Sequence, residues 1–175
     1  MNGIKKDFLA PLAVLSAICL IVSGALAATN RLTSPVIEQA AAERAGEIKR
    51  MIFPGTDDFI LIEADGLPRT VTDVYEAANG AGYIFIIRTL GYGGDIDIIC
   101  GIDMDGRIIR TETLKETETR GFVERVLALE PLYMGKDRNL EGIDAVSGAT
   151  ITFNAYKNGI LDAFEAYELV REGRQ

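Results

Sequence analysis

The residues best suited to carry chemistry lie together in one short stretch. Asp144 to Thr150 reads Asp-Ala-Val-Ser-Gly-Ala-Thr, and Ile151 and Thr152 follow it. The glycine and the alanine between the two hydroxyl residues leave the backbone uncrowded, so a bulky group could approach it and the hydroxyl of Thr150 could face outward. This pattern indicates a site at which a group is attached to the protein.

A helix is expected directly after this stretch. Between Phe153 and about Leu169 the apolar residues recur every three or four positions, which predicts a helix with one buried face. Thr152 or Asn154 could cap its start, which would place Thr150 just before the helix N-terminus. Unpaired N–H groups and the helix dipole favour a phosphate there, so a phosphorylated ligand esterified to Thr150 would be stabilised. The alternative is that Ser-Gly-Ala-Thr is only a turn before a helix.

The composition excludes several classes of function. The chain has 175 residues, enough for one domain and an appendage, and its net charge of -8 argues against a nucleic-acid partner. Histidine is absent, which excludes a Ser-His-Asp hydrolase and a histidine-based zinc site. Cys19 and Cys100 are expected to be buried and form no Cys-x-x-Cys motif. We therefore expect no metal site, and any redox chemistry requires a non-metal cofactor.

The N-terminal region is long and apolar enough to cross a membrane. Phe8 to Ala28 are 21 residues without a charge, and at about 1.5 Å per residue they just span a hydrocarbon core of about 30 Å. A cleaved signal peptide is the alternative, because Lys5 and Lys6 precede the run and Ala25-Leu26-Ala27 resembles a cleavage site. We favour a retained anchor because the run exceeds a signal-peptide core. The two lysines predict a cytoplasmic N-terminus and an extracytoplasmic domain at the cell (inner) membrane.

A second helix is predicted between Thr33 and Met51. Ser34 can cap it, Pro35 suits its first turn, and Pro54-Gly55 ends it. We interpret this helix as a stalk and packing element. The expected organisation is therefore a cytoplasmic N-terminus and anchor in residues 1–30, a helical stalk in 31–56 and an extracytoplasmic domain in 57–175.

The middle of the chain is rich in predicted β-strands that are joined by short turns. Such turns favour antiparallel hairpins, and the alternation of apolar and polar residues favours a sheet with one covered face. The expected strands are Phe59–Glu63, Thr70–Glu76, Gly82–Leu90, Asp95–Ile102 and Arg107–Leu114. The fold class expected from this pattern is α+β, with a single transmembrane helix and a mainly antiparallel sheet flanked by helices.

Gly91-Tyr92-Gly93-Gly94 separates two of these strands. The segment could be only a flexible hairpin turn. Its glycines would also let the backbone approach an aromatic ring system, to which Tyr92 could offer a face or a hydroxyl.

The motif at Thr150 resembles a known modification site. Ser147-Gly148-Ala149-Thr150-Ile151-Thr152, with Asp144 three residues before the serine, is similar to the flavinylation motif of FMN-binding domains. Such domains occur in the G subunit of Rnf electron-transport complexes and the C subunit of sodium-pumping NADH:quinone reductases. In those families a flavin transferase moves FMN from FAD onto the last threonine as a phosphoester.

The resemblance implies covalent FMN on Thr150, which would make the chain a flavoprotein and a phosphoprotein. It implies that the neighbouring residues shape the loop and that Asp144 either is read by the transferase or orients the loop. The implied loop residues are Ser147, Gly148, Ala149 and Thr152.

Two other segments also resemble this family. The glycine segment, followed by an apolar strand and Asp103-Met104-Asp105-Gly106, matches what the family shows before its flavin. The family's Glu-Thr-Pro-Gly-Leu-Gly is matched at Glu118, Thr119 and Gly121 only. The alternative there is a charged turn leading into a helix from Gly121 to Leu129 that Pro131 stops. The flavin contacts implied by the two segments are Gly91, Tyr92, Gly93, Gly94, Glu118 and Thr119.

The resemblance implies an electron-transfer subunit of a membrane-bound, ion-translocating ferredoxin:NAD oxidoreductase of the Rnf type. Such a subunit belongs to a translocase but completes no reaction alone. Its implied partners are the other membrane subunits and, during maturation, the flavin transferase. One alternative is a stand-alone anchored flavin carrier for another extracytoplasmic or quinone-linked system. Another is an anchored binding module without redox function.

Overall fold

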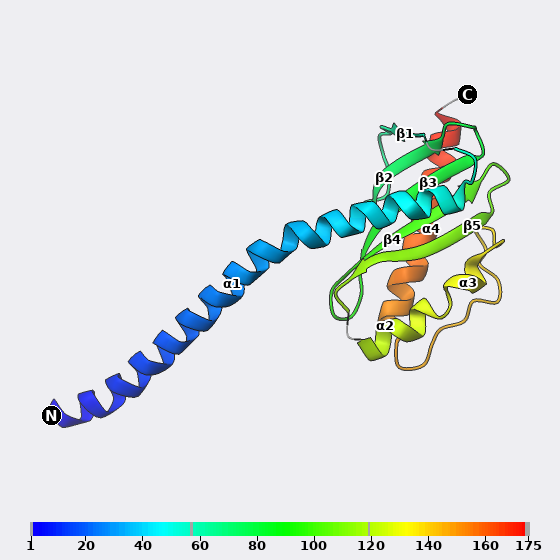
Figure 1. Cartoon of the computed structure of the whole chain (residues 1–175). Coiled ribbons are helices and arrows are strands. Elements are labelled where there is room, and N and C mark those ends of the chain that lie inside the picture. The colour runs from blue at the N-terminus through cyan, green and yellow to red at the C-terminus, as the bar shows by residue number, and fades with distance from the viewer. Residues whose placement is uncertain (1, 57, 119, 174–175) are drawn as a thin grey trace. The chain divides into compact units, whose positions relative to one another are not determined.

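The computed structural model describes residues 2–56, 58–118 and 120–173. The chain forms two compact units, residues 1–42 and residues 43–175. Its elements, shown in Figure 1, are in order α1 (Asn2–Ile52), β1 (Phe59–Ile62), β2 (Val71–Ala77), β3 (Gly82–Leu90), β4 (Asp95–Asp103), β5 (Ile108–Glu116), α2 (Arg120–Leu127), α3 (Glu130–Tyr133) and α4 (Thr150–Glu172).

Helix α1 runs without interruption through Pro35. The prediction that a separate helix begins at Ser34 was therefore wrong. A proline inside a helix removes one backbone hydrogen bond, but a helix that continues on both sides needs no new nucleation. Hydroxyl groups before the proline bond to backbone carbonyls of the preceding turn: Thr29 Oγ1 donates to Ala25 O at 2.9 Å, and Thr33 Oγ1 donates to Thr29 O at 3.0 Å.

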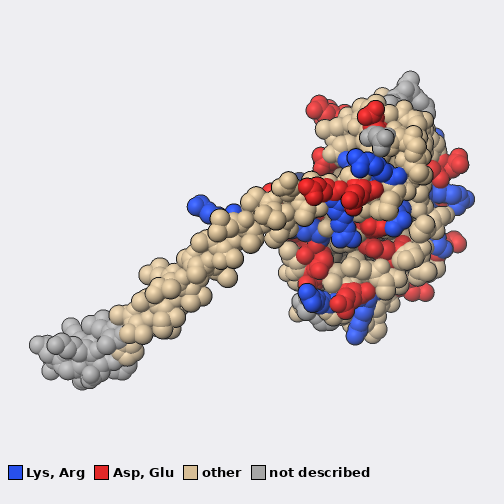
Figure 2. Space-filling view, in the orientation of Figure 1, with Lys and Arg blue, Asp and Glu red and all other residues tan. Residues whose placement is uncertain are grey.

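The N-terminal unit has the length and composition of a membrane span. No charged residue occurs between positions 11 and 30, which gives the uninterrupted tan stretch of the helix in Figure 2. A signal sequence at the same position would share these features. Cys19 is exposed on this helix in the isolated chain, contrary to the expected burial.

The five strands form one antiparallel sheet in the order β1-β2-β3-β4-β5. Each strand pairs with its neighbour in the sequence, as the short turns predicted. In the central pair, Phe85 lies opposite Cys100 and Ile87 opposite Ile98. The predicted α+β architecture, with one apolar N-terminal helix, an antiparallel sheet and flanking helices, is confirmed.

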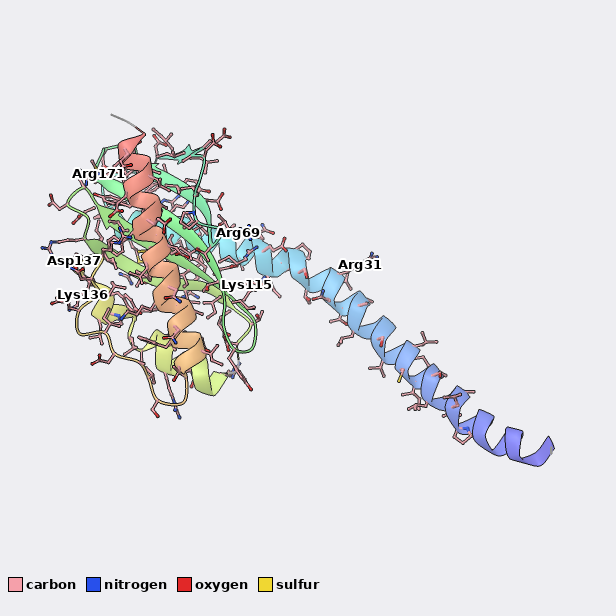
Figure 3. The ribbon with its side chains drawn as sticks, turned by 180° about the vertical axis from the view of Figure 1, so that it is seen from behind. Arg31, Arg69, Lys115, Lys136, Asp137 and Arg171 are labelled. Carbon is pink, nitrogen blue, oxygen red and sulfur yellow. The ribbon has the colours of Figure 1, made fainter. Side chains whose placement is uncertain are left out.

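Helix α4 lies across one face of this sheet, as Figure 3 shows from behind. Its apolar stripe includes Tyr156, Ile160 and Ala163, all fully buried in the main core with Phe85 and Ile98 of the sheet. Each large apolar side chain buried in this way contributes about 1.5–3 kcal/mol. Arg171, labelled in Figure 3, lies in the last turn of α4, where a cation suits the helix dipole.

The opposite face of the sheet is covered as well. Ile48 and Ile52, from the last turns of α1, pack with Phe53 against Ile84 and Ile99. The central strands β3 and β4 are therefore buried on both faces, and the expectation of a single covered face was wrong there. The alternation of apolar and polar residues did not reveal this second covered face, because the covering residues belong to a helix that is distant in the sequence from these strands.

The expected helix from Gly121 to Leu129 is present as α2, with ends that differ by one and two residues. Helix α2 ends at Leu127, and Pro131 lies in the first turn of the short helix α3 instead of stopping a helix. The first turn is the one place in a helix where the missing N–H of proline costs nothing.

Candidate functional site

The candidate site lies at the first turn of α4. The helix begins at Thr150, Ala149 is its N-cap, and the first helical bond runs from Phe153 N to Ala149 O at 2.8 Å. The prediction that Thr152 or Asn154 caps the helix was wrong, since both lie inside it. Because the side chain of Ala149 cannot accept a hydrogen bond, the N–H groups of the first turn receive no cap from this residue.

The hydroxyl residue with the most favourable position is Thr150. It is exposed, it is the first residue of α4, and it lines a pocket of about 360 Å³. An oxygen of a ligand attached there would lie beside the positive end of the helix dipole. The pocket is lined by Tyr92 together with the consecutive residues Gly148, Ala149, Thr150, Ile151 and Thr152.

The glycine segment reaches this pocket from the opposite side. Gly91 N donates to Gly94 O at 2.9 Å, which closes a tight turn. Tyr92 lies in this turn with 65% of its surface exposed and forms a wall of the pocket. A tyrosine in this position offers an aromatic face to a flat ligand.

Glu118 connects the two sides of the pocket. It is 8% exposed, and its carboxylate accepts hydrogen bonds from Gly93 N at 3.0 Å and from the hydroxyl of Thr152 at 3.3 Å. A side chain on Gly91 would occupy the position of this carboxylate, which explains the glycine. The carboxylate that the resemblance implies as a flavin contact therefore holds the glycine turn against α4.

The other predicted site residues do not all lie at the pocket. Gly94 packs against Thr117 and is not among the residues that line the pocket. Asp144 and Ser147 are exposed on the loop before α4. Thr119 lies outside the described residues.

The loop before α4 adopts its shape with the help of a basic residue. Gly148 has a φ of 80°, a left-handed conformation that favours glycine. Arg125 of α2 donates from Nη1 to Ser147 O at 3.1 Å. Helix α2 and the start of α4 lie at the same end of the sheet (Figure 1).

Three residues near the pocket were not singled out from the sequence as binding residues. Ile151 is apolar yet 56% exposed, and it lines the pocket. Arg125 and Lys157 donate to backbone carbonyls of the loop. The signal for Ile151 was its position directly after Thr150, whereas a basic residue on a predicted helix gives no signal of its partner.

A buried polar cluster fixes α4 farther along its length. The hydroxyl of Tyr156 donates to Glu130 Oε1 at 3.1 Å, and the hydroxyl of Thr113 donates to the same oxygen at 2.8 Å. Burial raises the pKa of the Glu130 carboxyl above its ordinary value, more than these two bonds lower it. The cluster joins α4 to β5 and to α3, and so helps to fix the helix whose first residue is Thr150.

Comparison with known proteins identifies this part of the chain. Residues 91–165 match the family described as FMN-binding domain. The chain contains an FMN-binding domain. The match includes the glycine segment, Glu118, the loop before α4 and most of α4.

The FMN-binding domain is accompanied by similarity over most of the chain. The chain is 26% identical to the G subunit of the Na(+)-translocating ferredoxin:NAD(+) oxidoreductase complex of Acetobacterium woodii, over 89% of each chain. It is also 26% identical to the G subunit of the proton-translocating ferredoxin:NAD(+) oxidoreductase complex of Clostridium ljungdahlii, over 86% of each. The G subunit of the ion-translocating oxidoreductase complex of Stutzerimonas stutzeri is 29% identical, over 86% of this chain and 77% of that one. The chain is a homologue of these three proteins.

The residues at the pocket fit FMN. An exposed hydroxyl, a helix start and a left-handed glycine suit a phosphate, while Tyr92 and the exposed Ile151 suit an aromatic ring system. The pocket also has the size typical of small-molecule sites, which lies at about 300–1,000 Å³.

Proposed function

We propose that this protein is an FMN-carrying electron-transfer subunit of a membrane-bound, ion-translocating ferredoxin:NAD oxidoreductase of the Rnf type. FMN is joined by a phosphoester to Thr150. The observation that carries the proposal is the exposed hydroxyl of Thr150 at the first position of α4, on the wall of the pocket that Tyr92 closes.

Each residue of the site has a distinct task in this proposal. Thr150 Oγ1 would lose its proton and replace AMP on the FMN phosphorus of FAD, so that the phosphoanhydride bond breaks and AMP leaves as the phosphoester forms. The N–H groups of the first turn of α4 would stabilise the phosphate. Tyr92 and Ile151 hold the ring by apolar contact, and Gly148 and Ala149 keep the loop narrow beside it. The bound flavin supplies the redox chemistry, whereas the protein binds and orients it.

Glu118 and the glycine turn position the ring indirectly. The hydrogen bond from Gly93 N fixes the turn that carries Tyr92, and the hydrogen bond from Thr152 fixes that turn to the helix bearing Thr150. The buried carboxylate of Glu118 therefore sets the distance between Thr150 and the ring of Tyr92. Asp144 and Ser147, both exposed on the loop, are accessible to the flavin transferase.

The membrane assignment supports the same function. We propose that residues 1–30 form a cytoplasmic N-terminus and anchor, residues 31–56 a helical stalk, and residues 57–175 an extracytoplasmic FMN domain. A covalent tether would keep FMN on the protein where free FMN is dilute. The other membrane subunits of the complex are the partners that exchange electrons with this flavin.

Co-purification with the complex tests this function. Full-length protein with a C-terminal tag is isolated from native membranes, next to the Thr150→Ala variant. We expect the other complex subunits to co-purify with both proteins. Reduced ferredoxin should reduce the flavin of the wild-type protein through these subunits, whereas Thr150→Ala should show no such flavin signal. A wild-type protein that carries FMN but purifies without these subunits would instead be a stand-alone carrier. A wild-type protein without FMN would be a binding module with no redox function.

A further inference from the structure

Arg125 reaches the attachment loop, residues 143–149, from the side of α2. Its Nη1 lies 3.1 Å from Ser147 O, and a Cβ atom placed on Gly148 would lie 3.1 Å from the same nitrogen. The guanidinium therefore rests against two consecutive residues of the loop, one of which lines the pocket. The side chain of Arg125 is exposed, so the cation is accessible beside the pocket.

Lys157 makes a similar bond at the other end of the loop. Its Nζ donates to Ile143 O at 3.2 Å and lies 5.9 Å from the centre of the Phe153 ring. Lys157 is seven positions beyond Thr150, which corresponds to about 10 Å along the helix. The loop is thus held by a cation at each end, and only Arg125 contacts a pocket residue.

The electrostatic setting gives Arg125 a second task. The chain has a net charge of -8, the carboxylate of Glu118 is buried beside the pocket, and Asp144 lies on the loop. A phosphodiester on Thr150 adds another negative charge to this region. A guanidinium has five N–H donors in a planar fork, so it can hold the loop carbonyl and a phosphate oxygen at the same time.

We propose that Arg125 is a positioning residue for the modification of Thr150 and the counter-charge of the resulting phosphodiester. The proposal rests on the proposed function. The bond to Ser147 O fixes the backbone on the N-terminal side of Gly148, and this sets the direction in which Thr150 leaves the loop. After the modification the same guanidinium pairs with the phosphate.

The rate of modification tests the positioning task. The full-length wild type, Arg125→Ala, Arg125→Lys and a control are expressed with a limiting amount of flavin transferase, and covalent flavin is followed by in-gel fluorescence. The control is Arg138→Ala, which removes an exposed arginine that pairs with Glu168 in the second half of α4. We expect Arg125→Ala to be modified on the order of tenfold more slowly than the wild type, because a misplaced reacting group slows a reaction. Arg125→Lys should recover part of the rate because it keeps the charge, and Arg138→Ala should match the wild type.

Thermal unfolding tests the counter-charge. Each protein is compared with and without flavin, the latter prepared without the transferase. If Arg125 pairs with the phosphate, modification should raise the Tm of the wild type by about 2–4 °C more than that of Arg125→Ala. Arg138→Ala should gain as much as the wild type. A purely structural role would lower the Tm of both forms of Arg125→Ala equally.

Equal rates for the wild type and Arg125→Ala, or equal Tm gains on modification, would overturn the assignment of Arg125 while leaving FMN on Thr150 intact. Lack of the adduct on the wild type would overturn the proposed function and this proposal together. If Arg125→Ala does not fold, as its Tm without flavin reveals, Arg125→Lys is compared with Arg138→Ala by the same two measurements, and we expect Arg125→Lys to show the slower modification and the smaller Tm gain.

Discussion

The hydroxyl of Thr152 donates a hydrogen bond of 3.3 Å to Oε1 of Glu118, 34 positions earlier in the sequence. Both side chains are buried, and the second oxygen of Glu118 accepts from Gly93 N. This pair joins the first turn of α4 to the turn that carries Tyr92. The two walls of the pocket at Thr150 are therefore linked through one carboxylate.

Replacing Glu118 should loosen this link. The Glu118→Gln variant retains one acceptor oxygen and presents an amide donor to a backbone N–H. We therefore expect its free energy of unfolding to be about 1–3 kcal/mol lower than that of the wild type. Glu124→Gln removes the same charge from the surface of α2, where the residue is exposed, and should stay within about 0.5 kcal/mol of the wild type. Urea unfolding of the three proteins without flavin measures both values, and equal midpoints would argue against the link.

Tyr92 should affect the flavin without affecting the fold. Because this side chain is 65% exposed, Tyr92→Ala should change the unfolding free energy by no more than about 0.5 kcal/mol. An aromatic face next to the isoalloxazine ring quenches its emission, so the variant should fluoresce more strongly than the wild type in the folded state and equally after denaturation. Leu132→Ala, an exposed apolar residue of α3, is the control and should leave the emission unchanged. Unaltered fluorescence in Tyr92→Ala would remove this residue from the flavin site.

The partly buried carboxyl of Glu130 predicts a pH dependence of stability. Burial raises its folded-state pKa above the ordinary value of 4.5, so the folded protein binds more protons than the unfolded chain between 4.5 and the raised value. The stability that this group contributes is complete below pH 4.5 and is lost as the pH rises through the folded pKa. Glu130→Gln lacks this titration. The stability of the wild type relative to the variant should thus fall as the pH rises from 4.5 towards 7, and parallel curves would contradict the assignment.

The orientation of the domain can be tested in membrane vesicles. Lys5 and Lys6 precede the apolar run of α1, and Arg31 is the first charge after it. This bias predicts a cytoplasmic N-terminus. Protease added to inverted vesicles should leave the domain intact, whereas protease added to right-side-out membranes should degrade it. Cleavage of the domain in inverted vesicles would reverse the predicted topology.

Local patterns were sufficient to predict the sheet. Turns such as Asp65-Gly66, Asn79-Gly80 and Asp105-Gly106 separate the strands, and the strand boundaries differ from the predicted ones by two residues at most. Gly66 and Gly80 both have a positive φ, as such turns require. Neighbouring strands then pair in sequence order, so that the whole sheet follows from nearest-neighbour information.

Contacts between distant segments could not be predicted in this way. The sequence motif identified Glu118 and Thr152 separately, but no local signal indicates that they bond to each other. The contact of Arg125 with Ser147 is of the same kind, since an exposed arginine on a helix is usually only solvated. The continuity of α1 through Pro35 was missed because Ser-Pro is a typical helix start, whereas here the helix already exists on both sides.

The central claim is the bond between FMN and Thr150. The most direct test is tandem mass spectrometry of the tryptic peptide 139–157, released from full-length protein that was expressed with a flavin transferase. The peptide also contains Ser147, Thr152 and Tyr156, so the fragments distinguish Thr150 from the other hydroxyl residues. We predict a mass increase of FMN less one water that is located on Thr150 and is absent from Thr150→Ala. An unmodified peptide, or the same increase on Ser147 or Thr152, would contradict the account.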